Sequence, residues 1–116
     1  AQIAMVLGMS ASQRRKGANG ELELCALLNA DLGTNAKRKL GQAREAGNDV
    51  DLPPFRIEVK RRARIGNVYD WMAQCTLDAG AAEIPVVALR ADGKKWLVLM
   101  DLPTFCKLAR EEIILD

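Results

Sequence analysis

Residues 48–60 restrict the possible folds of this chain more than any other stretch. They hold two short runs in which apolar and charged side chains alternate, separated by Pro53 and Pro54. Neighbouring side chains of an extended strand point to opposite faces, so each run predicts a strand with one apolar and one charged face. If the two strands pair as a hairpin, the charged side chains gather above an apolar floor.

The charged face of this hairpin predicts a site for a hard metal ion and a phosphate. Asp49 and Asp51 share it on the first run, and Arg56, Glu58 and Lys60 share it on the second. Mg²⁺ prefers a few carboxylates plus water, and it can both activate a water and neutralise charge that develops on a phosphate. We expect Asp49 and Glu58 to be metal ligands and Lys60 to orient or deprotonate the attacking water.

Three more oxygen donors are candidates for the same ion. The Val59 carbonyl lies next to the charged face. Asp51 shares a face with Asp49 and is either a second ligand or the main one. Glu21 lies at helical spacing on the inward stripe of an upstream helix, where a carboxylate needs a partner or a metal. The alternative for Glu21 is that a carboxylate in a first turn simply favours the helix dipole.

The order of the remaining elements predicts an α/β fold. A basic arm at 13–16 precedes a loop over 17–20, in which Asn19 is a possible N-cap. The sequence then predicts, in order, a helix over 20–31, a strand over 36–40, a polar loop over 41–48, the hairpin, a helix over 68–79, strands over 84–90 and 96–100, and a helix over 102–112. We expect a central mixed β-sheet flanked by helices on both faces.

Each predicted helix carries an apolar stripe that we expect to face the core. The three stripes are Leu24, Cys25, Leu28 and Leu32, then Val68, Met72, Cys75 and Ala79, then Leu102, Phe105, Cys106 and Ala109. All three cysteines lie on these stripes and none has Cys-x-x-Cys spacing. They therefore predict buried packing rather than a zinc site or a disulfide framework.

Histidine is absent from the chain, and this narrows the chemistry. Ser-His and Cys-His catalytic groups and His-ligated zinc are excluded, which favours an oxygen-ligated hard metal. The charge is uneven, because residues 1–64 hold twelve Lys/Arg against seven Asp/Glu, whereas residues 65–116 hold five against eight. A basic half that also contains the carboxylates suggests a polyanionic partner, although an ordinary solvated basic face would have the same composition.

The first residues are expected to lie outside the folded core. We expect an N-terminal extension over 1–13 and a single domain over 14–116. The apolar run at the start is too short to span a membrane and lacks the basic beginning of a signal peptide. We therefore expect no membrane partner and a cytoplasmic location.

Asn48-Asp49, eight further residues and Glu58-Val59-Lys60 together resemble the PD-(D/E)XK nuclease signature, with Asn48 in place of the usual Pro. Residues 16–24, 44–50 and 57–62 resemble archaeal-type Holliday junction resolvases and their bacteriophage relatives. The resemblance implies a restriction-endonuclease-like α-β-β-β-α-β core, here with an extra strand and a C-terminal helix. It also implies that Glu21 joins Asp49, Glu58 and Lys60 in catalysis, and that Gln74 lies near them.

The activity implied by this resemblance is endonucleolytic cleavage of branched DNA with Mg²⁺, for which Mn²⁺ would substitute. A homodimer would cut two opposed strands of a four-way junction, in the host-cell cytoplasm if a phage encodes the chain. Candidate phosphate contacts are Arg14, Arg15, Lys16, Lys37, Arg38, Lys39, Arg44, Arg61, Arg62 and Arg64. Tyr69 and Trp71 would stack on an unpaired base or pack in the core or at a dimer contact. Another DNA substrate, or DNA binding without cleavage, remains an alternative.

Overall fold

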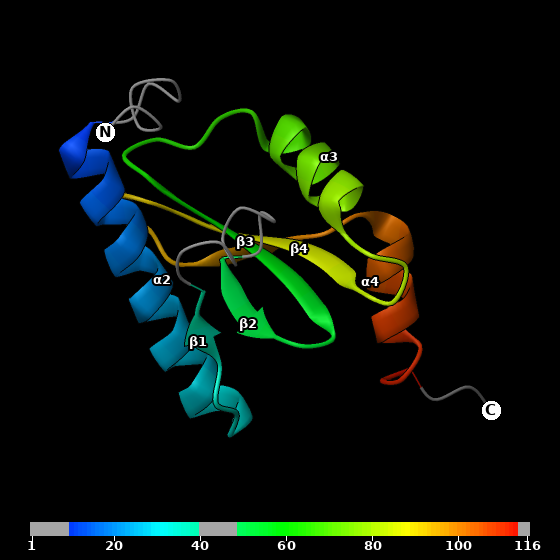
Figure 1. The fold of residues 1–116 in the computed structure, drawn as a ribbon. Coiled ribbons are helices and arrows are strands. Elements are labelled where there is room, and N and C mark those ends of the chain that lie inside the picture. The colour runs from blue at the N-terminus through cyan, green and yellow to red at the C-terminus, as the bar shows by residue number, and fades with distance from the viewer. Residues whose placement is uncertain (1–9, 40–48, 114–116) are drawn as a thin grey trace.

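A five-stranded mixed sheet runs through the molecule, with helix α2 on one face and helix α3 on the other (Figure 1). The computed structural model describes residues 10–39 and 49–113. The helices are α2 (Ala11–Leu32), α3 (Val68–Asp78) and α4 (Leu102–Ala109), and the strands are β1 (Lys37–Arg38), β2 (Val50–Leu52), β3 (Phe55–Arg62), β4 (Ile84–Ala91) and β5 (Leu97–Leu99). This order confirms the predicted α/β class and the predicted hairpin.

The strands lie side by side in chain order, and only the β3–β4 pair is parallel. Helix α3 makes the crossover between these two strands, as a parallel connection requires. A cis peptide bond joins Pro53 to Pro54 between β2 and β3.

The apolar run of β4 is covered on both of its faces. Val86 and Ala88 belong to the cluster under α2, whereas Val87 and Leu89 belong to the cluster under α3. A strand between two helical layers needs apolar side chains on both faces, which explains why its sequence does not alternate. The two clusters define an α2 face and an α3 face of the sheet.

Helix α2 begins about nine residues earlier than the sequence predicted. Ser10 caps it, and the Ser10 and Gln13 side chains exchange hydrogen bonds with each other's backbone N–H in a capping box. The predicted basic arm and the predicted loop over 17–20 are therefore wrong, because both are helical. Gly20 lets the helix pack closely on the sheet. A Cβ at this position would lie only 2.7 Å from Arg61 Cβ.

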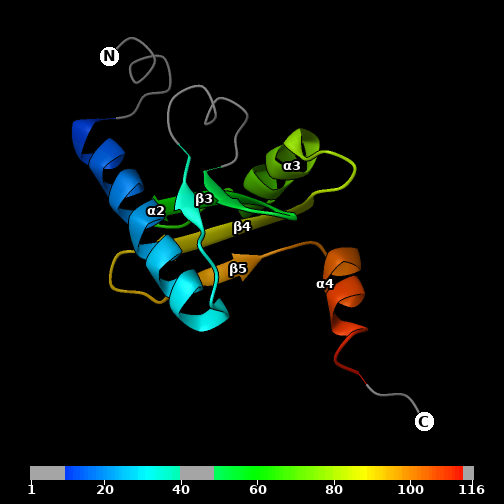
Figure 2. The same ribbon diagram turned by 60° about the horizontal axis from the view of Figure 1, so that its bottom comes forward.

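The prediction for the last helix is wrong in its burial. Leu102, Phe105 and Cys106 are exposed, and α4 buries none of its residues within the described part of the chain. Figure 2 shows the reason: α4 stands beyond the end of β5 rather than over a face of the sheet. Leu32, predicted inward, is also exposed because it lies in the last turn of α2, past the sheet.

The other predicted stripes agree with the structure. Leu24, Cys25 and Cys75 are buried. The polar loop over 41–48 and the first nine residues lie outside the described residues. In the part of the chain that the structure describes, no helix is long and apolar enough to cross a membrane.

Candidate active site

The α3 face of β3 carries the charged residues of the predicted site. Glu58 and Lys60 lie in register with Val87 and Leu89 of β4, which belong to the apolar cluster under α3. The two charged side chains are therefore held between the sheet and the helix, with 13% and 18% of their side-chain surfaces exposed. This half-buried position is costly for a charge unless it has a partner or a ligand.

Asp49 reaches this site from the beginning of β2. Its backbone N–H donates to the Ile57 carbonyl at 2.9 Å, although Ile57 is in register with Val50. Two consecutive residues thus oppose one, as in a β-bulge, a feature that often re-aims a side chain beside an active site. The Asp49 carboxylate Oδ2 then accepts a hydrogen bond of 2.8 Å from the backbone N–H of Val59.

Glu58 has a shifted pKa. Burial raises the pKa of Glu58 above its ordinary value, and the nearby negative charges of Asp49 and Asp78 raise it further. Lys60 opposes these effects, because its Nζ lies 3.1 Å from Glu58 Oε1 and favours the carboxylate. The other oxygen, Oε2, is buried and has no hydrogen-bond partner among the described residues.

Besides Glu58, Lys60 has a neighbour on α3. Its Nζ lies 5.6 Å from the centre of the Trp71 ring, and the guanidinium carbon of Arg62 lies 5.9 Å from the same centre. Both distances are within the range of cation–π attraction. Trp71 packs partly against the apolar cluster that contains Cys75, which agrees with the core packing expected as one role of this residue.

The donor set fits a hard divalent cation. Asp49 and Glu58 supply carboxylates that interact electrostatically, and Glu58 Oε2 is a buried acceptor with no donor in residues 10–39 and 49–113. In an antiparallel ladder, the N–H and C=O of one residue point to the same neighbouring strand. The Val59 carbonyl therefore points to the edge from which Asp49 approaches. A cation bound to these oxygens would give Glu58 Oε2 a partner. It would also reduce the repulsion between the Asp49 and Glu58 carboxylates.

No group of three or more His, Cys, Asp or Glu side chains in the described ranges could hold a metal ion. A magnesium site does not need such a group, because Mg²⁺ usually keeps several waters and binds only one or two carboxylates. The two carboxylates and one carbonyl at this site meet that lower requirement.

Asp51, the rival of Asp49, lies two residues further along the first run. It is exposed and in register with Arg56, and it lines a small hollow with Lys39, Pro54 and Glu83. It is not among the charges that shift the pKa of Glu58. The geometry therefore favours Asp49 over Asp51.

Glu21 and Gln74 are placed differently from Asp49, Glu58 and Lys60. Glu21 is buried, as predicted for an inward carboxylate, but it forms an ion pair with Arg38 of β1 on the α2 side of the sheet. Gln74 is exposed on α3, and its Nε2 donates to both carboxylate oxygens of Asp78 at 3.0 and 3.1 Å. Since Asp78 acts electrostatically on Glu58, Gln74 is connected to the site through one intermediate residue.

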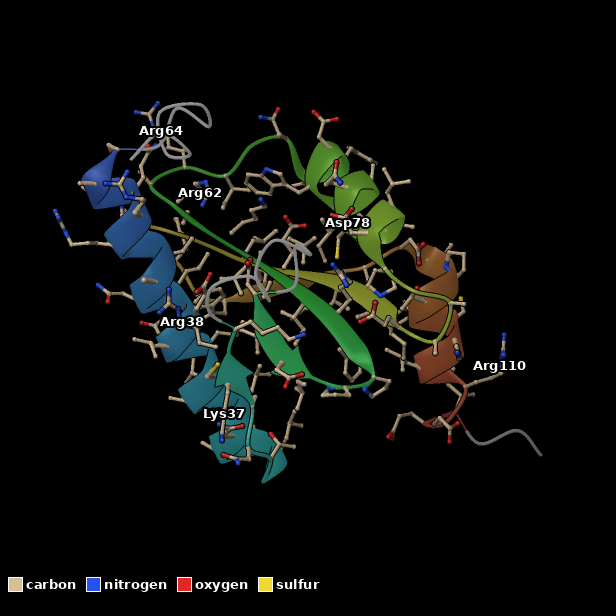
Figure 3. The ribbon with its side chains drawn as sticks, in the orientation of Figure 1. Lys37, Arg38, Arg62, Arg64, Asp78 and Arg110 are labelled. Atoms are coloured by element: carbon tan, nitrogen blue, oxygen red, sulfur yellow. The ribbon has the colours of Figure 1, made fainter. Side chains whose placement is uncertain are left out.

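Asp78 is a charged neighbour of the site that the sequence did not predict (Figure 3). It lies in the last turn of α3, four positions after Gln74. The signal was present, because residues at i and i+4 are neighbours on a helix surface, and a Gln one turn before an Asp predicts their contact. The approach of Asp78 to Glu58 depends on the packing of α3 against β3, which no local pattern reports.

The basic residues proposed for DNA contact fall into two groups in the described chain. Lys16 and Arg61 both bind Asp92, at 2.9 and 2.7 Å, and Arg38 binds Glu21. These three cations tie α2 to the sheet and to the β4–β5 turn. They stabilise the fold, so less of their charge is available to a polyanion.

The remaining candidates face outward or line the site. Arg14, Arg15, Lys37 and Arg64 are exposed, Lys39 is half-buried, and Arg62 lies over the Trp71 ring. Figure 3 shows Arg62 and Arg64 toward one end of the molecule and Lys37 toward the other. Arg44 lies outside the described residues.

A comparison with protein families identifies the chain. The family model described as "Phage putative PDDEXK endonuclease" matches residues 12–114. The chain belongs to this family. Comparison with curated proteins and with solved structures gave no match.

The phage PD-(D/E)XK endonuclease family agrees with the architecture and with the site. The N-terminal helix, the mixed sheet and the crossover helix α3 are consistent with the PD-(D/E)XK core. The family name describes an aspartate, an acidic residue and a lysine, which are the residue types that the β2–β3 hairpin brings together here. Membership implies a DNA substrate, and nucleases of this kind are typically metal-dependent.

Proposed function

We propose that this chain is a Mg²⁺-dependent, structure-selective endonuclease that resolves four-way DNA junctions by paired phosphodiester cleavage. The buried Glu58 Oε2 carries the proposal, because no donor among the described residues reaches it, and such an acceptor beside a second carboxylate and a lysine is expected where a cation binds. Mn²⁺ would substitute for Mg²⁺. The place of action would be the cytoplasm of the host cell.

Asp49, Glu58 and the Val59 carbonyl would hold the cation. When bound, it supplies a water of lowered pKa and neutralises charge on the scissile phosphate. Lys60 would donate from its ammonium group to the phosphate or orient the attacking water. The raised pKa of Glu58 means that this carboxylate is poorly stabilised by the protein alone, so it would gain from a cation.

Glu21 and Gln74 remain in the proposal as residues that act through a neighbour. Glu21 would act through Arg38, which it fixes on β1, and Gln74 would act through Asp78. Arg62 is the basic residue best placed to meet a phosphate near the site, since it shares the Trp71 ring with Lys60. Arg14, Arg15, Lys37, Lys39, Arg44 and Arg64 would contact the DNA backbone further away, and binding should therefore weaken steeply with salt.

Two opposed cuts require two active sites, and we infer a homodimer. Exposed apolar surface supports this inference. A groove of about 760 Å³ lies between α3 and the start of α4, lined by residues such as Met72, Leu77 and Leu99. Leu102 of α4 lines the groove and is exposed, and Phe105 is exposed three positions further along the same helix. Contiguous apolar surface of this kind marks interaction sites, and one chain offers both a projecting apolar helix and a groove.

The deciding experiment compares cleavage of a synthetic four-way junction with cleavage of its matched linear duplex, with and without Mg²⁺. Wild type should cut the junction only with the metal, and Glu58→Gln and Lys60→Ala should each lose about 10²-fold or more in rate. Glu112→Gln, an exposed carboxylate after α4, is the control and should cut like wild type. Equal cleavage by Glu58→Gln would overturn the site.

The same experiment separates the alternative substrates. Preference for a flap or a nicked duplex over the junction would indicate a nuclease of the same fold with another role. Salt-dependent binding of all these DNAs, without cleavage in Mg²⁺ or Mn²⁺, would indicate a DNA-binding module instead.

A further inference from the structure

Trp71 holds two cations of the site at once. The Lys60 ammonium lies 5.6 Å and the Arg62 guanidinium 5.9 Å from the centre of its ring. Lys60 and Arg62 are two residues apart on β3, so their side chains leave the same face of the strand. A single ring from α3 therefore contacts consecutive side chains on the active-site face.

The ring is itself fixed by packing. Trp71 contacts the apolar cluster of Cys75, Val87 and Leu89, which joins α3 to β4. Its backbone N–H also donates to the Asn67 carbonyl at 3.0 Å in the first turn of α3. Lys and Arg side chains have many rotamers, and ordering them costs conformational entropy. A ring anchored in the core can restrict both side chains without using a hydrogen-bond acceptor.

The ion pair between Lys60 and Glu58 should be weaker when Glu58 binds a metal ion than in the metal-free protein. Glu58 Oε1 accepts from Lys60 at 3.1 Å, but the proposed function gives the same carboxylate to a cation. An oxygen that faces a divalent ion attracts an ammonium group less strongly. The contact with Trp71 does not compete for carboxylate oxygens, so it would persist when Glu58 is engaged elsewhere.

We propose that Trp71 is a positioning residue that keeps Lys60 and Arg62 over the active site. The inference rests on the proposed nuclease function. It gives the Trp71 ring two effects, one on the rate of cleavage and one on DNA binding. Through Lys60 it sets the rate of the chemical step, and through Arg62 it contributes to holding DNA. The strength of cation–π attraction decreases from Trp to Phe and is absent for Leu, so Trp71→Phe should retain much of what Trp71→Leu loses.

The first test needs neither metal nor DNA. NMR of the metal-free protein should show the side-chain methylene protons of Lys60 shifted upfield by the ring current of Trp71. The shift should decrease in Trp71→Phe and disappear in Trp71→Leu. Trp96→Phe is the matched control, because the Trp96 ring donates to Glu23 of α2 and packs against the cluster on the α2 face of the sheet. Unshifted Lys60 methylene protons in wild type would overturn the inference, whether or not the Leu variant folds.

The second test is single-turnover cleavage of the junction at saturating DNA. Trp71→Leu should lower the rate by about tenfold and weaken DNA binding. Trp71→Phe should keep a rate within about threefold of wild type, and the control Trp96→Phe should cut at the wild-type rate. Arg62→Gln should weaken DNA binding. If wild type cuts no DNA, the proposed function fails although the ring-current shift is present. If wild type and Trp71→Leu cut equally, only the role of Trp71 fails.

Discussion

The Asp49 carboxylate accepts a hydrogen bond from the Val59 backbone N–H, one residue after Glu58. The side chain thus occupies the position where a backbone carbonyl of β2 would continue the ladder. This relationship joins the two halves of the hairpin site, because the bulge at the start of β2 also directs Asp49 toward Glu58. One carboxylate serves both the fold and the site, and the two roles can be separated.

Removing the Asp49 acceptor should destabilise the fold, whereas removing only its charge should not. Asp49→Ala leaves the buried Val59 N–H without a partner and should cost about 1–3 kcal/mol in the free energy of unfolding. Asp49→Asn keeps an oxygen acceptor and should cost clearly less. Both variants should lose junction cleavage, because both lose the charge. Urea unfolding of the three proteins measures the difference, and equal stability of Ala and Asn variants would contradict the bond.

Neutralising Glu58 should stabilise the metal-free protein at neutral pH. A folded-state pKa raised above the ordinary value of 4.5 means that the folded state binds more protons than the unfolded state just above pH 4.5. The contribution of Glu58 to stability therefore falls as pH rises through that window. Glu58→Gln removes the buried charge and keeps an acceptor for Lys60, so a gain of about 1 kcal/mol at pH 7 is expected.

The pH dependence of this gain is its control. Unfolding of wild type and Glu58→Gln in the presence of a chelator should give free energies that converge as pH falls below 4.5. Comparing the two proteins at each pH cancels the titration of all other groups. A Gln variant that is less stable than wild type at pH 7 would show that Lys60 fully compensates the buried charge.

Divalent cations should stabilise wild type through the same carboxylates. A site with a dissociation constant of about 1 mM adds about 1.4 kcal/mol at 10 mM free ion. Mg²⁺ and Ca²⁺ should therefore raise the midpoint of thermal unfolding of wild type, but not of Glu58→Gln or Asp49→Asn. Asp51→Asn should behave like wild type, because Asp51 pairs with Arg56, two positions before Glu58, and is not among the charges that shift the pKa of Glu58. Loss of the metal effect in Asp51→Asn would transfer the ligand role to that residue.

Local patterns predicted the hairpin because strand alternation is visible in the sequence. The inward orientation of Glu21 also followed from helical spacing, whereas its partner Arg38 did not, because the contact joins residues 17 positions apart through the packing of α2 on β1. The apolar stripe of α4 indicated a covered face, but residues 10–39 and 49–113 leave it exposed. Periodicity reports which face is apolar, and tertiary or quaternary structure decides what lies against it.

Glycines in α2 account for the misplaced start of that helix. Gly17 and Gly20 predict a loop, since glycine costs about 1 kcal/mol relative to Ala in a helix. The structure separates them: a Cβ at Gly17 would have nothing within 4 Å, whereas one at Gly20 would lie 2.7 Å from Arg61 Cβ. Gly17→Ala should therefore stabilise the protein by about 0.5–1 kcal/mol, and Gly20→Ala should destabilise it. Thermal unfolding of this matched pair measures both effects, and a stabilising Gly20→Ala would contradict the close packing of α2 on β3.

A charge on α4 should break the proposed dimer without unfolding the chain. Phe105 on α4 and Leu22 on α2 are both 56% exposed, so Glu at either position should change stability by less than about 0.5 kcal/mol in a monomer. Only Phe105→Glu adds a charge to the exposed apolar stripe of α4, whose Leu102 lines the groove. Sedimentation should give a dimer for wild type and for Leu22→Glu, and a monomer for Phe105→Glu. In the cleavage assay, Phe105→Glu should nick one strand of the junction but no longer make the paired cuts. A dimer that persists in Phe105→Glu would place the subunit contact elsewhere.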